Sequence, residues 1–434
     1  MSEIVRSSGL RIDLPDGVVV NEVSPTPAPA TRRGGRQYGP RPLPSAAPAP
    51  APLVEALESQ GLVAVDTLEL DATPEVAAEV RGARPVARRV DLALDLGADE
   101  GAVVLVEQDG VYSWHLPDAV PEAAERRRGG GAGRQVRFSV DLGRPAASRD
   151  ELKRRGFVSD FIVGKVRAYV LKFAVAWGTG KLMAYLERNV RKGLVDMSAG
   201  DPDRWSRLDA LDTLGLPTGR PARVLLFIHG TFSSTLGSYG SLASTPEGEA
   251  LLRNASERYD AVIGFDHPTL SLGPEENARE LLDSLQAYPW PMPPHLDIVT
   301  YSRGGLVYRA LAELLLPGAQ WRPLIDRVIF VAVPNAGTHL AEPDNWHVLL
   351  DLYTNLASSA GTLLSKIPYL TIATKIFDEL IQGLGALGKY LATQAITEGD
   401  VPGLAAMEPD GQFITTINRP QAGQPTVDTT YYCA

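Results

Sequence analysis

The sequence predicts an α/β protein, in which a parallel sheet carries helices and a helical cap and is preceded by a small β-rich domain and a helical linker. Three observations lead to this prediction. From about residue 205 the chain alternates between apolar strand-like runs and amphipathic helical segments. Those runs are almost continuously apolar and rich in Val and Ile, as strands buried on both faces require. Before residue 205, short strand-like runs bounded by turn residues dominate instead.

Composition limits the class of protein. The chain has 434 residues, of which 44% are hydrophobic, enough for two or three domains with real cores. A net charge of −10 and a pI near 5.3 give no overall attraction to phosphate backbones, so we expect no nucleic-acid partner. The single cysteine, Cys433, excludes an internal disulfide framework. Without a signal-peptide stretch near the start or an 18-residue apolar run, we expect a cytoplasmic protein with no membrane-spanning helix.

The first domains follow from composition shifts. Residues 1–52 contain a segment, from Pro25 to Pro52, rich in Pro and Ala, which favours an extended and disordered tether. Residues 53–145 begin with a short helical pattern at Leu53 and continue with strand-like runs. Asp109 and Gly110 lie between two of these runs, which is a good hairpin signal. A further strand with period-two alternation is expected from Gln135 to Leu142.

Residues 146–204 are predicted to form a basic, amphipathic helical linker. Basic residues outnumber acidic ones over 151–200, and apolar residues such as Phe161, Val166 and Val170 have helical spacing. Peripheral contact of 151–200 with an anionic membrane surface or an acidic partner is one interpretation. Packing of the apolar face on neighbouring domains is the more ordinary one.

The α/β domain is assigned to residues 205–434, with a leucine-rich helical cap over about 346–397. Its expected elements are, in order, a strand in A-R-V-L-L-F-I-H-G, a helix over 244–257, a strand in Y-D-A-V-I-G-F-D-H, a helix over 274–287, a strand in L-D-I-V-T-Y-S with its helix, and a strand in D-R-V-I-F-V-A-V-P. The cap is predicted to form an apolar pocket and to act as a lid. Ordinary packing explains most of its leucines equally well.

Ser302 stands at the carboxyl end of the third of these strands and at the start of a helix, where open α/β sheets hold their ligands. A tight turn between strand and helix would expose the serine hydroxyl and requires small residues two positions away on either side. Gly304 meets this requirement. Thr300 replaces the usual glycine on the other side, so the strict G-x-S-x-G pattern is broken.

A second feature lies at the end of the first strand, in F-I-H-G-T-F-S-S. An amide after such a glycine, together with the amide after the serine, binds the oxyanion in serine hydrolases. Those amides would belong to Thr231 and Arg303. We assign His229, Gly230 and Phe232 of this loop to substrate binding.

With these motifs in place, the chain from about 205 resembles the α/β-hydrolases of the bacterial lipase and esterase branch. The runs F-D-H-P-T-L and V-P-N-A-G-T, and P-G-L-A-A-M-E-P-D-G-Q-F-I-T-T-I-N near the end, are also similar to such sequences. The resemblance implies Ser302 as nucleophile, an acyl-enzyme intermediate, a hydrophobic ester as substrate and no cofactor.

The base is the missing part of this reading. In this fold the order along the chain is serine, acid, histidine, and T-T-Y-Y-C-A begins the strand that precedes the acid in lipase-like chains, so we expect both partners to lie beyond Ala434. The rival hypothesis uses Asp344 as acid and His347 as base. His229 is interpreted as ordering its loop. A metal site at His339, Asp344 and His347 is the weakest alternative, and we expect no metal.

Two functions from different classes remain. The first is a serine carboxylester hydrolase that uses Ser302. The second is a catalytically inactive binding or effector module with the hydrolase fold, whose protein partner the sequence does not identify.

Overall fold

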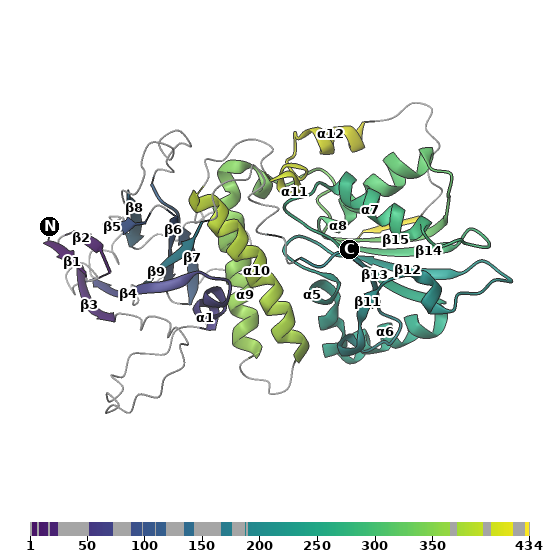
Figure 1. Cartoon of the computed structure of the whole chain (residues 1–434), viewed down its shortest axis with the longest axis horizontal. Helices are drawn as coiled ribbons and strands as arrows, with labels where there is room; N and C mark the ends of the chain where they lie inside the picture. Colours follow the sequence, from purple (N-terminus) through teal and green to yellow (C-terminus); the bar gives the residue numbers. More distant parts are fainter. Residues whose placement is uncertain are drawn as a thin grey trace. The chain divides into compact units, whose positions relative to one another are not determined.

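The computed structural model divides the chain into two compact units (Figure 1). One unit comprises residues 1–179, 350–358 and 387–395, and the other comprises 180–349, 359–386 and 396–434. The structure describes residues 2–6, 8–15, 18–24, 52–72, 88–97, 99–108, 110–118, 134–142, 166–175, 187, 190–364, 371–393, 401–419 and 430–433. The core of the expected tether, 25–51, and most of the expected linker therefore lie outside the described residues.

The first unit is built on two antiparallel sheets. A four-stranded sheet has the order β1-β2-β5-β8 and a five-stranded sheet the order β3-β4-β9-β6-β7. The strands are β1 (Ser2–Val5), β2 (Leu10–Leu14), β3 (Val18–Ser24), β4 (Val63–Ala72), β5 (Arg88–Leu96), β6 (Glu100–Gln108), β7 (Val111–His115), β8 (Arg134–Leu142) and β9 (Val166–Ala174). One hydrophobic cluster contains residues from both sheets, among them Ile12, Leu92, Phe138, Leu68 and Val170, so the sheets share a core.

Several expectations for this region are confirmed. The short helix is α1 (Pro52–Ser59), and the strand expected from Gln135 is β8. Strands β6 and β7 form the expected hairpin, with Gln108 opposite Val111, although Asp109 itself lies outside the described residues.

The domain boundaries differ from the predicted ones. Residues 2–24, predicted as part of a disordered tether, supply three strands, because their alternating apolar side chains reach the shared core: Leu10, Ile12 and Leu14 are all buried. The helix expected around Val166 and Val170 is the strand β9, which lies between β4 and β6. A run rich in Val and buried on both faces favours a central strand, and the helical spacing was coincidental. Further on, β10 (Gly193–Asp196) belongs to the α/β sheet, which therefore begins before residue 205.

Helix α9 (Trp346–Leu364) covers the edge of the five-stranded sheet within the first unit. The side chain of Asn355 accepts from the Tyr112 amide at 2.8 Å and donates to the Tyr112 carbonyl at 2.7 Å, as a neighbouring strand would. One turn earlier, Asp351 Oδ1 accepts from the Trp114 amide at 2.7 Å. The Trp114 indole donates to Thr354 Oγ1 at 2.8 Å. Polar side chains of a helix thus satisfy the backbone of edge strand β7.

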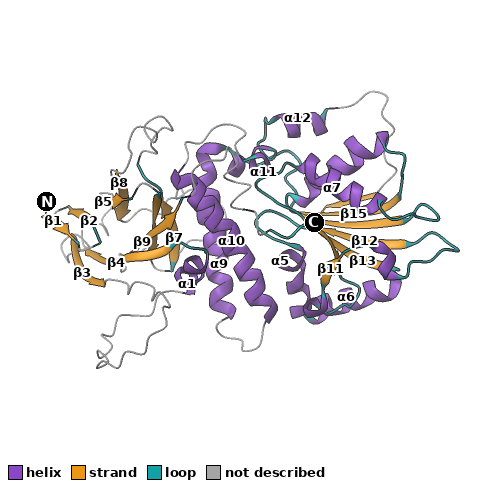
Figure 2. Ribbon diagram, in the orientation of Figure 1, coloured by secondary structure: helices purple, strands orange, loops and turns teal. Residues whose placement is uncertain are grey.

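The second unit contains a seven-stranded sheet of order β11-β10-β13-β12-β14-β15-β16. Its parallel strands are β12 (Arg223–Ile228), β13 (Ala261–Asp266), β14 (His295–Tyr301), β15 (Leu324–Val331) and β16 (Thr430–Cys433), and β10 and β11 (Ser206–Leu208) form an antiparallel edge. Helices cover both faces of this sheet (Figure 2). They are α5 (Thr235–Tyr239), α6 (Pro246–Arg258), α7 (Pro274–Gln286) and α8 (Gly304–Arg309).

Side-chain alternation along the central strands explains the two layers. Val224, Leu226 and Ile228 of β12 pack with Leu281 of α7 and other helix residues in one cluster. Leu225 and Phe227 point the other way and pack with Tyr239 and Ala255, from α5 and α6. The apolar runs therefore bury both faces, as predicted.

The helices of the expected cap are α9 and α10 (Thr371–Thr393), followed by α11 (Pro402–Ala405) and α12 (Gln412–Asn418). No helix in the described residues is long and apolar enough to cross a membrane.

Candidate functional site

Ser302 occupies a strained turn between β14 and α8. Its φ is +51°, a left-handed conformation that non-glycine residues rarely adopt. Its amide donates to the Val331 carbonyl of β15 at 2.8 Å, and its own carbonyl accepts from the Gly305 amide at 3.1 Å. Such backbone strain costs on the order of 1–3 kcal/mol and tends to occur at functional sites. The neighbouring strand therefore holds the serine in the strand-to-helix turn that its sequence position predicted.

Close backbone packing explains the residues around the serine. A Cβ at Gly304 would lie 2.3 Å from the Ile228 carbonyl oxygen, so only glycine fits. Thr300, which breaks the G-x-S-x-G pattern, is fully buried, and its hydroxyl donates to the Ile329 carbonyl at 3.2 Å. The sheet thus accommodates this threonine without an unsatisfied polar atom.

The loop after β12 lies against the serine. A Cβ at Gly230 would be 2.8 Å from Ser302 Cβ and 3.1 Å from the Tyr301 carbonyl oxygen. Phe232, two residues on, has a φ of +56°, and its amide donates to Thr269 Oγ1 at 3.2 Å. Thr231 is buried, and its hydroxyl has no hydrogen-bond partner among the described atoms. The structure therefore brings Gly230 and Ser302 into contact.

His229 anchors this loop. Its Nδ1 donates to the Gly230 carbonyl at 2.9 Å, and its Nε2 accepts from the His267 amide at 3.1 Å, so both ring nitrogens are engaged. The ring stacks on His267 with centroids 4.0 Å apart. Burial lowers the pKa of His229 and holds that of His267 well below its usual value. Both rings are therefore neutral, and His229 has no nitrogen available to act as a base.

The Arg303 side chain is fully buried beside the turn. Its Nε donates to the Gly403 carbonyl at 3.2 Å and one terminal nitrogen donates to the Leu272 carbonyl at 2.5 Å, while the other has no partner in the described structure. Burial lowers its pKa to about 10, against the raising effect of Glu187 and Glu276, so the guanidinium stays charged. Arg303 thus connects the turn that holds Ser302 to two other segments of the chain by hydrogen bonds.

Glu187 is a site residue that the sequence did not indicate. Its buried carboxylate accepts from the amides of Thr269, Leu270 and Ser271 at 3.1, 3.0 and 2.6 Å. These three amides belong to the segment between β13 and α7, from which the Leu272 carbonyl binds Arg303. Glu187 was missed because it fell in the expected linker, and no motif accompanies it.

Asp344 and His347 do not form a hydrogen-bonded triad with Ser302. Both side chains are exposed, and in the described part of the chain no hydrogen bond joins them to each other or to the serine. His339 instead bonds Glu342, with 2.7 Å between Nδ1 and Oε1. Among the described residues no group of His, Cys, Asp and Glu could hold a metal ion.

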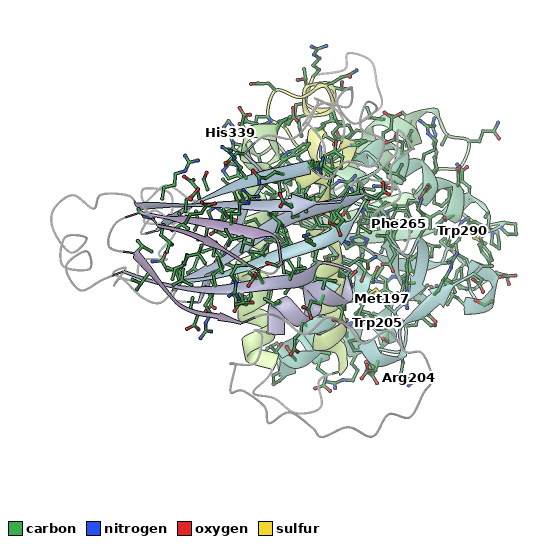
Figure 3. The ribbon with its side chains drawn as sticks, turned by 60° about the vertical axis from the view of Figure 1, so that its left-hand side comes forward. Met197, Arg204, Trp205, Phe265, Trp290 and His339 are labelled. Carbon is green, nitrogen blue, oxygen red and sulfur yellow. The ribbon has the colours of Figure 1, made fainter. Side chains whose placement is uncertain are left out.

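A cavity of about 450 Å³ lies beside the loop after β12. Phe232, Ser233 and Ser234 of that loop form one wall. The other walls come from α10, through Asp378, Gln382 and Gly383, and from β10, β11 and their flanks, through Arg191, Lys192, Trp205 and Arg207. Trp205 packs against the cluster that contains Met197, and the exposed Arg204 is its neighbour (Figure 3). Ser302 does not line this cavity, but His229 and Phe232 do, and they flank the Gly230 that lies against the serine.

The strand order, the antiparallel edge and the strained serine between β14 and α8 define an α/β-hydrolase fold. The chain belongs to the family described as a domain of unknown function, DUF7379, whose model matches residues 192–434. A second model, also a domain of unknown function, DUF7362, matches residues 17–173. No curated protein matches the chain by sequence.

Solved structures similar to this chain over about half its length include a phospholipase and a lipase. Phospholipase PlaB from Legionella pneumophila is 15% identical with a TM-score of 0.29, and the match covers 49% of this chain and 38% of that one. Bacillus licheniformis lipase BlEst2 is 17% identical with a TM-score of 0.27, covering 50% and 69%. MenH from S. aureus is 14% identical with a TM-score of 0.25, covering 49% and 86%. The fold assignment rests on the strand order and the serine turn of this chain.

Proposed function

We propose that this protein is a serine hydrolase of carboxylic esters, with Ser302 as nucleophile and a hydrophobic acyl group on its substrate. The observation that carries the proposal is the positive φ of Ser302 at the end of the central strand β14, in contact with Gly230. A strained serine in this position is what the nucleophile turn of an α/β-hydrolase requires.

In the proposed reaction Ser302 Oγ attacks the ester carbonyl and loses its proton to a base. The carbonyl oxygen becomes an oxyanion, which accepts from the amides of Thr231 and Arg303. In the described residues no backbone hydrogen bond uses either amide. The C–O bond to the alcohol then breaks, leaving an acyl-enzyme that water hydrolyses to the acid and free Ser302.

His229 does not serve as the base, since both of its ring nitrogens are hydrogen-bonded to the backbone of its own loop and of His267. In this fold the acid and histidine follow the serine along the chain. The Asp344 and His347 pair remains a prediction for those roles.

The test is labelling of the full protein with a fluorophosphonate probe. We expect Ser302 to carry the label, and Ser302→Ala to abolish both labelling and the hydrolysis of 4-nitrophenyl butyrate. Ser244→Ala is the matched control, because Ser244 is exposed on the same unit and its hydroxyl only bonds the Ser241 carbonyl. Labelling that survives Ser302→Ala overturns the proposal.

A second candidate is a hydrolase-fold binding module without catalysis. It is favoured by one observation, that no described histidine hydrogen-bonds Ser302. Absence of labelling and of ester turnover in the folded wild-type protein would support it.

A further inference from the structure

In the cavity beside the loop after β12, most hydrogen-bond acceptors already have partners, whereas several donors do not. Two of its three carboxylates already accept backbone amides. Glu187 accepts three backbone amides, and Asp266 Oδ1 accepts the Thr235 amide at 2.7 Å. On the α10 wall, Asp378 is the remaining carboxylate and is exposed.

The donors, by contrast, lack strong partners. The Trp205 indole nitrogen is buried with no hydrogen bond in the described structure. Lys192 and Arg207 meet carboxylates only at 3.8 Å, at exposed positions where such pairs are weak. Arg191 has no ion pair or hydrogen bond with any residue that the structure describes. A buried donor without an acceptor is costly, so a site of this kind gains when an acceptor enters it.

The chemistry of these donors specifies the ligand. Guanidinium and ammonium groups make their strongest hydrogen bonds with carboxylate and phosphate oxygens, and an indole N–H can only donate. The cavity therefore fits a group that carries several acceptor oxygens and a negative charge. Its apolar lining, which includes Phe232, Gly383 and Ala386, fits a short hydrocarbon chain attached to that group.

The loop shared with Ser302 connects the cavity to the candidate site. Phe232, Ser233 and Ser234 line the cavity, while Gly230 of the same loop contacts Ser302. We propose that the cavity binds an anionic oxygen group, carboxylate or phosphate, on the far end of the ester substrate. This inference rests on the proposed function of Ser302 and narrows its substrates to acidic esters.

The kinetic test compares esters that differ only in the distal group. On the acyl side these are 4-nitrophenyl pentanoate, 4-nitrophenyl hydrogen glutarate and the 4-nitrophenyl ester of 4-phosphonobutanoic acid, and on the alcohol side butyl acetate and 4-acetoxybutanoate. In at least one series we expect the anionic ester to have the higher kcat/KM. The double variant Arg191→Ala/Arg207→Ala should raise its KM about tenfold, with kcat unchanged, because two charge-assisted contacts are lost. Whichever acyl-side anion shows the larger effect identifies carboxylate or phosphate as the group that binds.

Two further variants sharpen the result. Trp205→Phe keeps an aromatic ring and removes the donor, so it should raise KM about threefold more for the anionic ester than for the neutral ester. Arg204→Ala removes an exposed neighbouring cation that does not line the cavity, and it should change neither ester. Equal kcat/KM for neutral and anionic esters in both series, or a preference that survives the double variant, overturns the inference.

A binding measurement separates this inference from the proposed function. Calorimetric titration of the full protein with glutarate and with butylphosphonate requires no turnover. If Ser302 is not labelled but these anions bind and the double variant abolishes binding, the anion site stands and the hydrolase proposal falls. If Ser302 is labelled and neither anion binds, the anion site is wrong and the hydrolase proposal stands.

Discussion

Arg303 Nε lies 3.2 Å from the carbonyl oxygen of Gly403, a residue 100 positions further along the chain. Gly403 is itself closely packed, since a Cβ there would be 1.9 Å from the Thr269 carbonyl oxygen. The same guanidinium binds the Leu272 carbonyl. The candidate nucleophile turn, the segment after β13 and helix α11 are therefore held together by one buried side chain.

Replacing Arg303 should destabilise the second unit. Arg303→Met leaves the carbonyls of Leu272 and Gly403 without their donor, and we expect a loss of about 2–4 kcal/mol in the free energy of unfolding. Urea unfolding measures it. Exposed Arg322→Met, whose side chain bonds only nearby carbonyls at 2.8 and 3.4 Å, should cost far less. Equal midpoints for the two variants would show that the buried guanidinium is not structural.

Gly230→Ala should impair the nucleophile rather than the fold. The new Cβ would lie 2.8 Å from Ser302 Cβ, so the serine must move. We expect fluorophosphonate labelling of Ser302 to slow by about tenfold or more, because displacements near 1 Å can cost about 100-fold in rate. Gly219→Ala is the control, since a Cβ there meets nothing within 4 Å. Unchanged labelling in Gly230→Ala would place the reacting hydroxyl away from this contact.

Glu187→Gln should loosen the segment between β13 and α7. The carboxylate accepts three backbone amides, whereas an amide side chain offers one oxygen and presents N–H donors to the remaining amides. We expect a loss of about 1–3 kcal/mol in unfolding free energy, and faster hydrogen exchange at Thr269, Leu270 and Ser271. Exposed Glu257→Gln should change neither quantity. If these three amides exchange as slowly in Glu187→Gln as in wild type, the prediction is wrong.

Asp351 should make the first unit less stable as pH rises. Burial raises the pKa of this carboxyl from 3.8 to about 7, although the Trp114 amide acts to lower it. Between these two values the folded state binds the proton that the unfolded state releases. The contribution of this proton to the free energy of unfolding is therefore fully present below about pH 4. It is lost as pH rises to 7, which lowers the free energy of unfolding by up to about 4 kcal/mol.

Urea unfolding at several pH values checks this slope against Asp351→Asn. The asparagine carbonyl can still accept from the Trp114 amide but does not titrate, so the variant should gain stability over wild type as pH rises from 4 to 7. The buried neutral histidines, His229 and His267, act in the opposite direction, because their contribution to stability is lost as pH falls. This effect is the same in wild type and in Asp351→Asn, so it cancels in the comparison. Exposed Asp344→Asn should reproduce the wild-type profile. A pH-independent difference between wild type and Asp351→Asn would rule out the titration.

The α/β domain could be predicted because its signals are local. Runs such as R-V-L-L-F-I and A-V-I-G-F-D are apolar at nearly every position, which predicts burial on both faces, and the serine turn carries its signature within five residues. The first unit was harder, because local spacing does not decide whether Val166 and Val170 belong to a helix or a strand. That depends on pairing with distant strands: Val166 lies opposite Leu70 of β4 and Gln108 of β6, which are 96 and 58 residues earlier in the chain.

The sequence alone determined the α/β class and the place of Ser302 between strand and helix, and its resemblance to lipase-like hydrolases implied the pairing of that turn with the His229–Gly230 loop. Periodicity and small residues at fixed offsets encode those features within short segments. Only the tertiary structure decided that residues 2–24 join a β-sandwich, that Glu187 and Arg303 fix the loops around the serine, and that donors gather at one cavity. Those relationships depend on which distant segments share a core. Apolar groups are buried by contacts between such segments, so a short stretch of sequence does not reveal them.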